Sequence, residues 1–340
     1  MEKHKFEGLY LFLISILPIS IVAGPSISLL NILFIITLFL INYKLSEIQI
    51  EKKFLLYLLS ILYVYLIFNS FISIDYKEGI YRNLGFLRFI ILFIAINFFF
   101  KISKSKFKFL NIWSAIILII IFDSFIEFSF GKNLLGYGDD LYADRVVSFF
   151  KDEPIVGAYL LGFNFIIVGY FFEKFYKQNT KLKLALFLIL FILVGCILIT
   201  GERSNGIKAV IGLMIFLFLN NKISAKIKIS IFLLSLIFTS LIISNSNYLK
   251  VRYGQQLFSQ LFDSNQRDQF IENNLYLKLY KSGFAVFKDN PIFGVGNKNY
   301  RVITTRNIET KINDDYLLNT HPHQIYIELL SEHGLVGTII

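Results

Sequence analysis

The sequence predicts an all-α, polytopic integral membrane protein of about ten transmembrane helices, with a large outer loop before the last helix. Of the 340 residues, 55% are hydrophobic and only 17% are charged, and the mean hydropathy is +0.62. Apolar runs recur along the whole chain, and most lysines lie in the short segments between these runs. This composition is typical of chains whose main solvent is the lipid bilayer.

The first apolar run extends from about Leu9 to Ala23 and contains Pro18. A signal peptide also begins with a basic start and a short apolar stretch, but no Ala-x-Ala cleavage site is present here, so we expect a retained helix. The following runs approach the ~20 residues that a span requires. They lie near Ile27–Ile41, Phe54–Ile72, Leu84–Phe100, Phe109–Phe128, Ile155–Phe172, Leu182–Ile199, Asn205–Leu219 and Ile229–Ser244, and a last run starts near Gln324.

The distribution of lysine and arginine predicts the orientation, because cytoplasmic loops of membrane proteins carry the excess of these residues. With a cytoplasmic N-terminus, sixteen of them fall in the inner segments and six in the shorter outer loops. The alternation then places two longer segments outside, Ser129–Pro154 and the 77 residues Ser246–Pro322. The net charge of +10 therefore reports membrane topology and does not indicate a nucleic-acid-binding surface.

The longer outer loop contains a stretch with the pattern of an amphipathic helix. Its apolar side chains recur at helical spacing, and Asn290-Pro291 ends the run. These side chains are Tyr276, Leu279, Tyr280, Phe284 and Phe287. We expect this helix to lie on the outer membrane surface or to cap the bundle.

His321 and His323 flank Pro322 where this loop meets the last apolar run. A histidine with a pKa near neutrality at a wet membrane boundary is suited to take a proton from a sugar hydroxyl. The alternative is a polar interfacial pair that caps a helix, and composition alone favours that alternative. Two histidines without a third ligand do not predict zinc, and the only cysteine, Cys196, lies in an apolar run. We expect neither a metal ion nor a cofactor.

Arg203 lies between two adjacent apolar runs, at their outer ends. A guanidinium group matches phosphate oxygens in a two-pronged geometry, so this position is suited to an anion. A salt bridge to Glu202 or contact with lipid headgroups is an equally good interpretation. Arg145, in the first outer loop, is a candidate for binding sugar or phosphate, or for pairing with Glu153.

Three further charges lie within predicted spans: Arg88, Asp123 and Glu127. Charges inside a membrane suggest function, but we favour an ion pair between helices because pairing is how such charges are usually tolerated. The segment Asn290–Gly296 contains Gly294 and Gly296, whose backbone amides are candidates for contacting an anion, although a turn that ends a helix is the simpler interpretation.

Taken together, these segments resemble the O-antigen ligase and polymerase family of bacterial membrane glycosyltransferases. The family pattern His-[Asn/Ser/Gln]-x9-Gly-x-x-[Gly/Thr/Tyr] is met by His323, Gln324, Gly334 and Gly337. Arg203, the turn with Gly294 and Gly296, and the large outer loop follow in the family's order. The resemblance divides the chain into N-terminal transmembrane helices, residues 1–181 with outer loop 129–154, and an O-antigen ligase-related region, residues 182–340 with periplasmic loop 246–322.

The chain departs from the family in two respects. A second functional arginine often precedes the amphipathic helix, where Tyr276 stands here, so Arg267, Lys278 and Arg301 are the candidates to replace it. Relatives usually continue for one or two spans beyond Ile340, so we expect a truncated chain.

The resemblance implies transfer of a glycan from an undecaprenyl-diphosphate carrier at the periplasmic face of the bacterial inner membrane, as in lipopolysaccharide biosynthesis. His323 would be the general base and Arg203 would bind the diphosphate, without a metal ion. Arg145, Arg267, Lys278, Arg301, Gly294, Gly296 and His321 would contact the substrate. The acceptor would be lipid A core for a ligase, or a second lipid-linked glycan for a polymerase. A transporter of lipid-linked oligosaccharide is the alternative from another class, which inverted repeats would favour.

Overall fold

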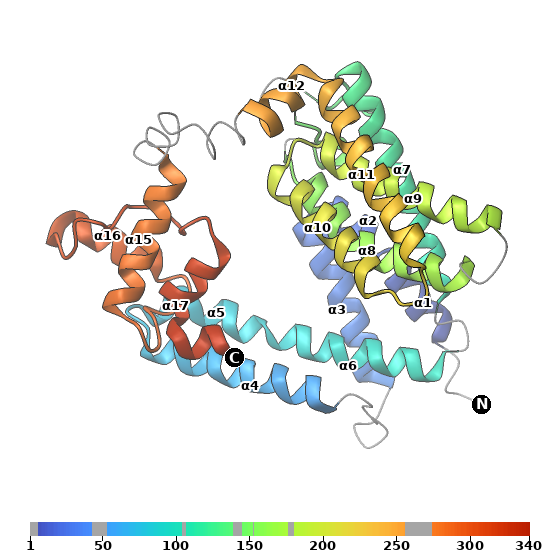
Figure 1. The fold of residues 1–340 in the computed structure, drawn as a ribbon. Coiled ribbons are helices and arrows are strands. Elements are labelled where there is room, and N and C mark those ends of the chain that lie inside the picture. The colour runs from blue at the N-terminus through green and yellow to red at the C-terminus, as the bar shows by residue number, and fades with distance from the viewer. Residues whose placement is uncertain are drawn as a thin grey trace. The chain divides into compact units, whose positions relative to one another are not determined.

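The computed structural model describes residues 6–42, 53–103, 107–138, 145–151, 153–175, 180–255 and 274–340. Within these ranges all regular secondary structure is helical, as Figure 1 shows. This confirms the predicted all-α class. The physical reason is that a backbone inside a bilayer has to satisfy its own hydrogen bonds, which a helix does within one segment.

Six helices of the described residues are long and apolar enough to cross a membrane, which confirms the prediction of a polytopic membrane protein. The third of them combines α5 (Tyr76–Gly85) with α6 (Leu87–Ile102). All six overlap with predicted spans. They are Pro25–Asn42 (α3), Lys53–Ile72 (α4), Tyr76–Lys101, Lys108–Phe130 (α7), Val156–Phe175 (α8) and Ala225–Ser244 (α11).

The remaining apolar runs form other helices. The first run consists of α1 (Glu7–Ser15) and α2 (Leu17–Val22), and Pro18 lies in the first turn of α2, where its missing N–H costs nothing. α9 extends over Thr180–Ile199, and its shorter stretch Phe187–Ile199 is apolar. α10 (Arg203–Leu219) has 17 residues and α17 (Ile325–Ile339) has 15.

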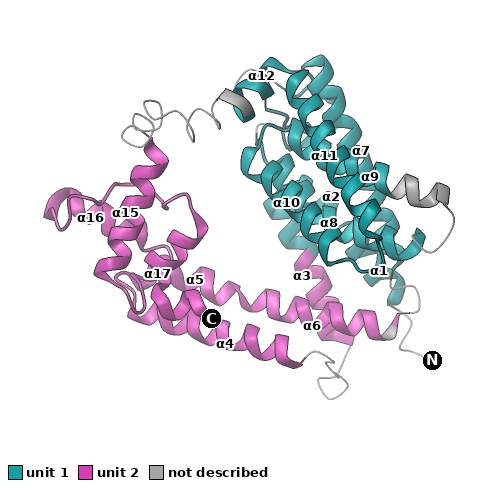
Figure 2. Ribbon diagram, in the orientation of Figure 1, with its two compact units in different colours: residues 1–31, 104–264 teal, residues 32–103, 265–340 magenta. Residues whose placement is uncertain are grey.

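The chain divides into two compact units, shown in Figure 2. Unit 1 comprises residues 1–31 and 104–264, and unit 2 comprises residues 32–103 and 265–340. Helix α3 contributes to both, because the division falls after Asn31. Each unit thus combines residues from both sides of position 181, where the sequence resemblance places its boundary.

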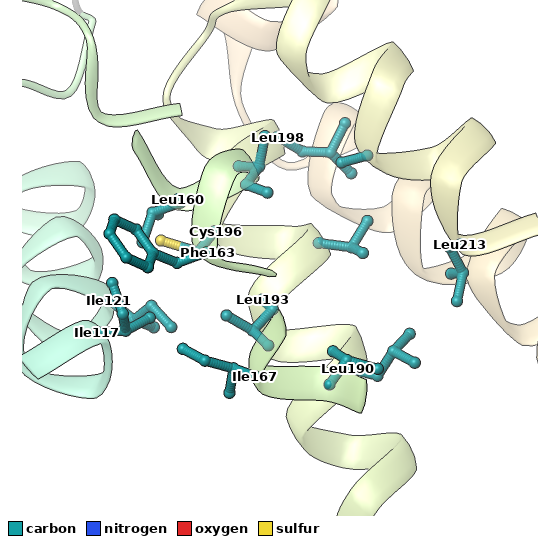
Figure 3. Packing of buried hydrophobic residues seen from close by; sticks show 14 of the residues in the cluster. Ile117, Ile121, Leu160, Phe163, Ile167, Leu190, Leu193, Cys196, Leu198 and Leu213 are labelled. Atoms are coloured by element: carbon teal, nitrogen blue, oxygen red, sulfur yellow. The ribbon is translucent and has the colours of Figure 1, made fainter. Parts of the chain in front are cut away.

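Unit 1 is held together by an apolar core between α7, α8, α9 and α10, part of which is shown in Figure 3. Leu160 and Ile197 are fully buried in it, and so is the free thiol of Cys196. Two short elements follow α11, the turn of helix α12 (Asn247–Leu249) and a π-helix, η5 (Lys250–Gln255), and Leu249 and Tyr253 join the same core.

Two carboxylates near the C-terminal end of α7 bind the loop that follows this helix. Glu127 accepts hydrogen bonds from the backbone N–H groups of Val147 (2.8 Å) and Ser148 (2.6 Å). Asp123 accepts hydrogen bonds from the N–H of Leu134 (2.9 Å) and from the Ser148 hydroxyl (2.5 Å). These hydrogen bonds stand in place of the ion pair between helices that the sequence favours. They satisfy the two buried carboxylates and hold the loop against α7.

Unit 2 joins α4, α5 and α6 to the last part of the chain. α15 (Leu275–Asp289) is the predicted amphipathic helix: the Asn274 side chain caps its start by accepting from the Leu277 N–H (3.2 Å), and it ends before Pro291. Its buried residues include Leu279 and Val286, and α15 packs against α17. Helix α16 (Tyr300–Thr310) was not predicted, since its sequence is largely polar.

Candidate functional site

The His-Pro-His turn of unit 2 lies between α15 and α17. His323 has a positive φ of 57°, an unusual backbone conformation for a residue with a side chain. Pro322 is buried against α15 at Gly283, where an added Cβ would lie 2.8 Å from the Pro322 Cβ. The neighbouring structure therefore holds His323 in a conformation that costs about 1–3 kcal/mol, and such strain is common at functional sites.

Three aromatic rings meet at this turn. The His321 and His323 rings have centroids 4.1 Å apart, and the Tyr276 ring of α15 meets His323 edge to face at 5.6 Å. His321 Nδ1 also lies 2.9 Å from the Thr320 hydroxyl. Burial lowers the pKa of His321, and the nearby His323 and Lys298 lower it further, although Glu328 acts in the opposite direction. His321 therefore favours the neutral form, and the exposed His323 ring is the one open to a substrate.

Tyr276, which the sequence resemblance aligns with the family's second arginine, meets the His323 ring edge to face in the structure. Lys278 is exposed and lies two residues further along α15, which at 3.6 residues per turn directs it to the opposite face. Arg301 lies 3.8 Å from the Glu78 carboxylate, with which it forms an ion pair. Arg267 lies outside the described residues.

Helix α17, which follows His323, is broken at Gly334. The backbone there has φ 62° and ψ −164°, a combination that is essentially restricted to glycine. Beside the break runs the turn of residues 291–296. Leu335 N–H donates to the Pro291 carbonyl (2.9 Å), and Val336 N–H donates to the Ile292 carbonyl (3.1 Å). The turn and the motif helix, which the sequence shows as separate features, thus form one backbone-paired structure.

The two glycines of the turn contribute to this pairing. Gly296 N–H donates to the Glu332 carbonyl (2.9 Å), and Gly294 N–H donates to the Asn290 carbonyl (3.1 Å). The amides that an anion would need therefore already have partners within the protein. A Cβ at Gly294 would lie 2.4 Å from the Glu332 backbone, so close packing explains why glycine stands there.

Two side chains of α4 support the same structure, and sequence reasoning missed both. The fully buried Asn69 donates to the Phe293 carbonyl (3.0 Å) and accepts from the Asn297 N–H (3.0 Å). The Tyr65 hydroxyl donates to the His333 carbonyl (2.6 Å), and its ring leaves room only for glycine at Gly337. Both residues lie in an apolar span, and their spacing of four residues, which places two polar side chains on one face of the helix, was the signal that could have found them.

Unit 1 contains the predicted Arg203, which is the first residue of α10, directly after the turn from α9, and lies outside the predicted spans. Its neighbour Glu202 accepts hydrogen bonds from the N–H groups of Gly157 (2.6 Å) and Ala158 (3.2 Å), at the start of α8, and from Asn205. Burial raises the pKa of Glu202, whereas these hydrogen bonds and the charge of Arg145 lower it. Glu202 thus binds the start of α8, and not Arg203 as one of the alternative interpretations of the sequence had it.

Two other arginines lie close enough to act electrostatically on Arg203. Burial lowers the pKa of Arg203, and the charges of Arg252 and Arg145 lower it further. Arg252 also donates to the Gly201 carbonyl (3.4 Å). The loop after α7 and the π-helix thus bring Arg145 and Arg252 near Arg203 at the start of α10. Arg252 was missed because it is one of many basic residues in a long loop.

We call these three residues the arginine cluster (Arg145, Arg203 and Arg252); the charges of Arg145 and Arg252 both repel the Arg203 guanidinium group. Like charges gathered at a partly buried site are stabilised by an anion, and guanidinium groups match phosphate oxygens. Among the residues that the structure describes, no group of three or more His, Cys, Asp or Glu side chains is placed to hold a metal ion.

Residues 185–340 match the family model described as O-Antigen ligase. The matched region contains Arg203, Arg252, the turn at residues 291–296 and the motif from His323 to Gly337. No curated protein and no solved structure matches the chain. Over residues 185–340, this membrane protein is therefore similar to the O-antigen ligase family.

Proposed function

We propose that the protein transfers a glycan from an undecaprenyl-diphosphate carrier to a sugar acceptor at the periplasmic face of the bacterial inner membrane. The observation that carries this proposal is the arginine cluster, which gathers three positive charges beside a carboxylate that is already hydrogen-bonded. The family match supports a glycosyltransferase acting on lipid-linked glycans.

In the proposed reaction, the acceptor hydroxyl attacks the anomeric carbon of the donor sugar. The new glycosidic bond forms as the bond from that carbon to the diphosphate oxygen breaks. His323 takes the hydroxyl proton, and the undecaprenyl diphosphate leaves with the bonding electron pair. The arginine cluster stabilises the negative charge that develops on the diphosphate, which is the role that preorganised cations play in such reactions.

His323 suits the role of base for two reasons. Its ring is exposed, and the turn fixes the direction of that ring through the buried Pro322 and the contact with Tyr276. A base held in one orientation contributes more to the rate than a mobile one, because the reacting geometry is formed in advance. We propose that no metal ion takes part, since the arginines supply the positive charge.

The proposal is tested in cells by expressing the His323→Ala and Arg203→Ala variants in a strain that lacks the gene. Surface polysaccharide should be lost with both variants while the protein remains in the membrane. Wild-type amounts of surface polysaccharide with both variants would refute the assignment. Phe284→Ala, an exposed change on α15, is a control that should restore polymer.

The same deletion strain distinguishes the two enzymatic forms of the proposal. Free lipid-linked polymer indicates that the missing activity is a ligase, which uses lipid A core as acceptor. Single repeat units on lipid A core indicate a polymerase, which uses a second lipid-linked glycan. Transfer by the purified protein in detergent, where there are no two sides of a membrane, excludes the transporter.

A further inference from the structure

Unit 2 contains a cavity of about 200 Å³, lined by polar and apolar side chains, that the proposed reaction does not yet use. Its walls come from α4, α5, the residue Phe86 between α5 and α6, the turn that includes Asn297, and α17. This volume has room for a group of about the size of one sugar ring. Its polar lining residues are Arg82, Asn83, Asn297, Glu328, Glu332 and His333.

One lining side chain is buried without a hydrogen-bond partner. His333 is 7% exposed, and its Nδ1 atom has no hydrogen-bond partner among the described residues. A buried polar atom usually has a partner, so an unpaired one beside a cavity points to a bound molecule that supplies it. The adjacent Glu332 is 2% exposed and accepts from the backbone N–H groups of Lys298 and Tyr300, the latter at 3.4 Å, and its two oxygens can accept further hydrogen bonds.

The charges of the lining residues indicate which kind of molecule the cavity can bind. Two carboxylates are balanced by Arg82 in the wall and by Lys298, which lies 3.9 Å from the Glu328 carboxylate. A balanced site favours neither an anion nor a metal ion. It offers acceptors on the carboxylates, donors on Arg82 and the carboxamides, and an apolar wall at Phe86. A neutral sugar ring, with hydroxyls that donate and accept and with apolar C–H faces, fits this combination.

The cavity begins directly after the catalytic turn. Ile325 and Glu328 line it, and they belong to the first turn of α17, which starts two residues after His323. Glu328 also acts electrostatically on His321, whose ring contacts His323. A sugar held in this cavity would therefore lie close to the base that removes a proton from the acceptor.

We infer that this cavity, the acceptor-ring pocket, binds one sugar ring of the acceptor glycan and positions that glycan for His323. The inference rests on the proposed function, because that function supplies the acceptor. The recognition chemistry is shared by both sources of acceptor, the core oligosaccharide and the repeat-unit oligosaccharide, and the experiment separates them.

Binding is measured by saturation-transfer NMR with the full-length protein in nanodiscs and without a donor, so that no transfer is needed. The probes are lipid-free core oligosaccharide and lipid-free repeat-unit oligosaccharide from the same strain. Binding of the core identifies a ligase acceptor, and binding of the repeat unit identifies a polymerase acceptor; either result supports the pocket. Failure of both to bind at millimolar concentration would overturn the inference.

Paired variants locate the bound sugar. Ile325 lines the pocket and is 59% exposed, whereas the adjacent Tyr326 is 67% exposed and does not line it. Ile325→Trp should place an indole at the pocket and weaken oligosaccharide binding at least tenfold, while Tyr326→Trp should bind like the wild type. His333→Phe, which removes the unpaired nitrogen, should also weaken binding. Equal binding by wild type, Ile325→Trp and His333→Phe would contradict the inference.

Two further measurements keep this test separate from that of the proposed function. In Ile325→Trp the amides of residues 291–297 and 331–336 should exchange with solvent at the wild-type rate, which shows that unit 2 of the variant is folded. His323→Ala should still bind the oligosaccharide although it does not transfer it. If His323→Ala transfers normally while Ile325→Trp no longer binds oligosaccharide, the catalytic role fails and the pocket stands.

Discussion

Replacing Gly334 by alanine should break the paired structure that supports the His323 motif. An added Cβ would lie 2.4 Å from the carbonyl carbon and oxygen of Ile292 and 2.6 Å from the Phe293 nitrogen. These are backbone atoms of the turn, which is itself fixed by hydrogen bonds to α17. Neither side can therefore yield without losing those bonds.

The expected cost follows from two effects. A residue with a side chain in this Gly-only conformation costs about 1–3 kcal/mol. Displacing the turn weakens the bonds from Leu335 N–H to the Pro291 carbonyl and from Val336 N–H to the Ile292 carbonyl, each of which contributes about 0.5–1.5 kcal/mol. The total is about 4 kcal/mol, which corresponds to roughly a thousandfold change in an opening equilibrium.

Hydrogen exchange followed by mass spectrometry measures this opening in the full-length protein. Amides of residues 331–336 should exchange roughly a thousandfold faster in Gly334→Ala than in the wild type. Gly131→Ala is the control: Gly131 has φ 77° and nothing within 4 Å of an added Cβ, so only the backbone cost of about 1–2 kcal/mol remains. If residues 331–336 of Gly334→Ala exchange within threefold of the wild-type rate, the turn at residues 291–296 does not require glycine at position 334.

Three other predictions concern Asn69, the arginine cluster and pH. Asn69→Leu leaves the buried Phe293 carbonyl and Asn297 N–H without their hydrogen-bond partner, which costs about 1–3 kcal/mol of stability for each group. The amides of residues 291–297 should therefore exchange with solvent faster than in the wild type. An unchanged exchange rate would contradict the supporting role of Asn69. Arg252→Ala should weaken pyrophosphate binding about tenfold, as measured by calorimetry, because a charge-assisted contact is lost. The exposed Lys250→Ala is the control and should bind pyrophosphate like the wild type. Equal affinities of Arg252→Ala and the wild type would show that Arg252 is not part of the arginine cluster. Burial, His323 and Lys298 lower the pKa of His321 in the folded protein. Between that lowered pKa and about 6.5, the His321 ring therefore binds more protons in the unfolded chain than in the folded protein. The unfolding midpoint should fall as pH drops through this window in the wild type, and less so in His321→Ala; identical pH dependence would contradict this.

The helices could be predicted from sequence because their signals are local. Apolar runs located six of the spans, and the spacing of apolar side chains with Asn290-Pro291 at the end located α15. The His323 motif pointed to the family that residues 185–340 match. In each case the residues that carry the signal are close neighbours in the chain.

What could not be predicted depends on contacts between distant residues. Asn69 and Phe293 are separated by 224 positions, and a single asparagine in an apolar span gives no indication of its partner. The break at Gly334 has a similar cause, since an isolated glycine is tolerated within a helix and only the turn at residues 291–296 explains it. The sequence suggested that Asp123 and Glu127 form one half of an ion pair, because the backbone N–H groups that bind them cannot be identified from the sequence.

Direct assay of glycan transfer by the purified protein tests the catalytic role of His323. Full-length wild type, His323→Ala and His321→Ala are incubated with labelled undecaprenyl-diphosphate glycan and acceptor, with and without EDTA. His323→Ala should lower the transfer rate about a hundredfold or more, as expected for loss of a general base. His321→Ala should lower the rate less, and EDTA should have no effect. Transfer by His323→Ala at the wild-type rate would show that His323 is not the general base.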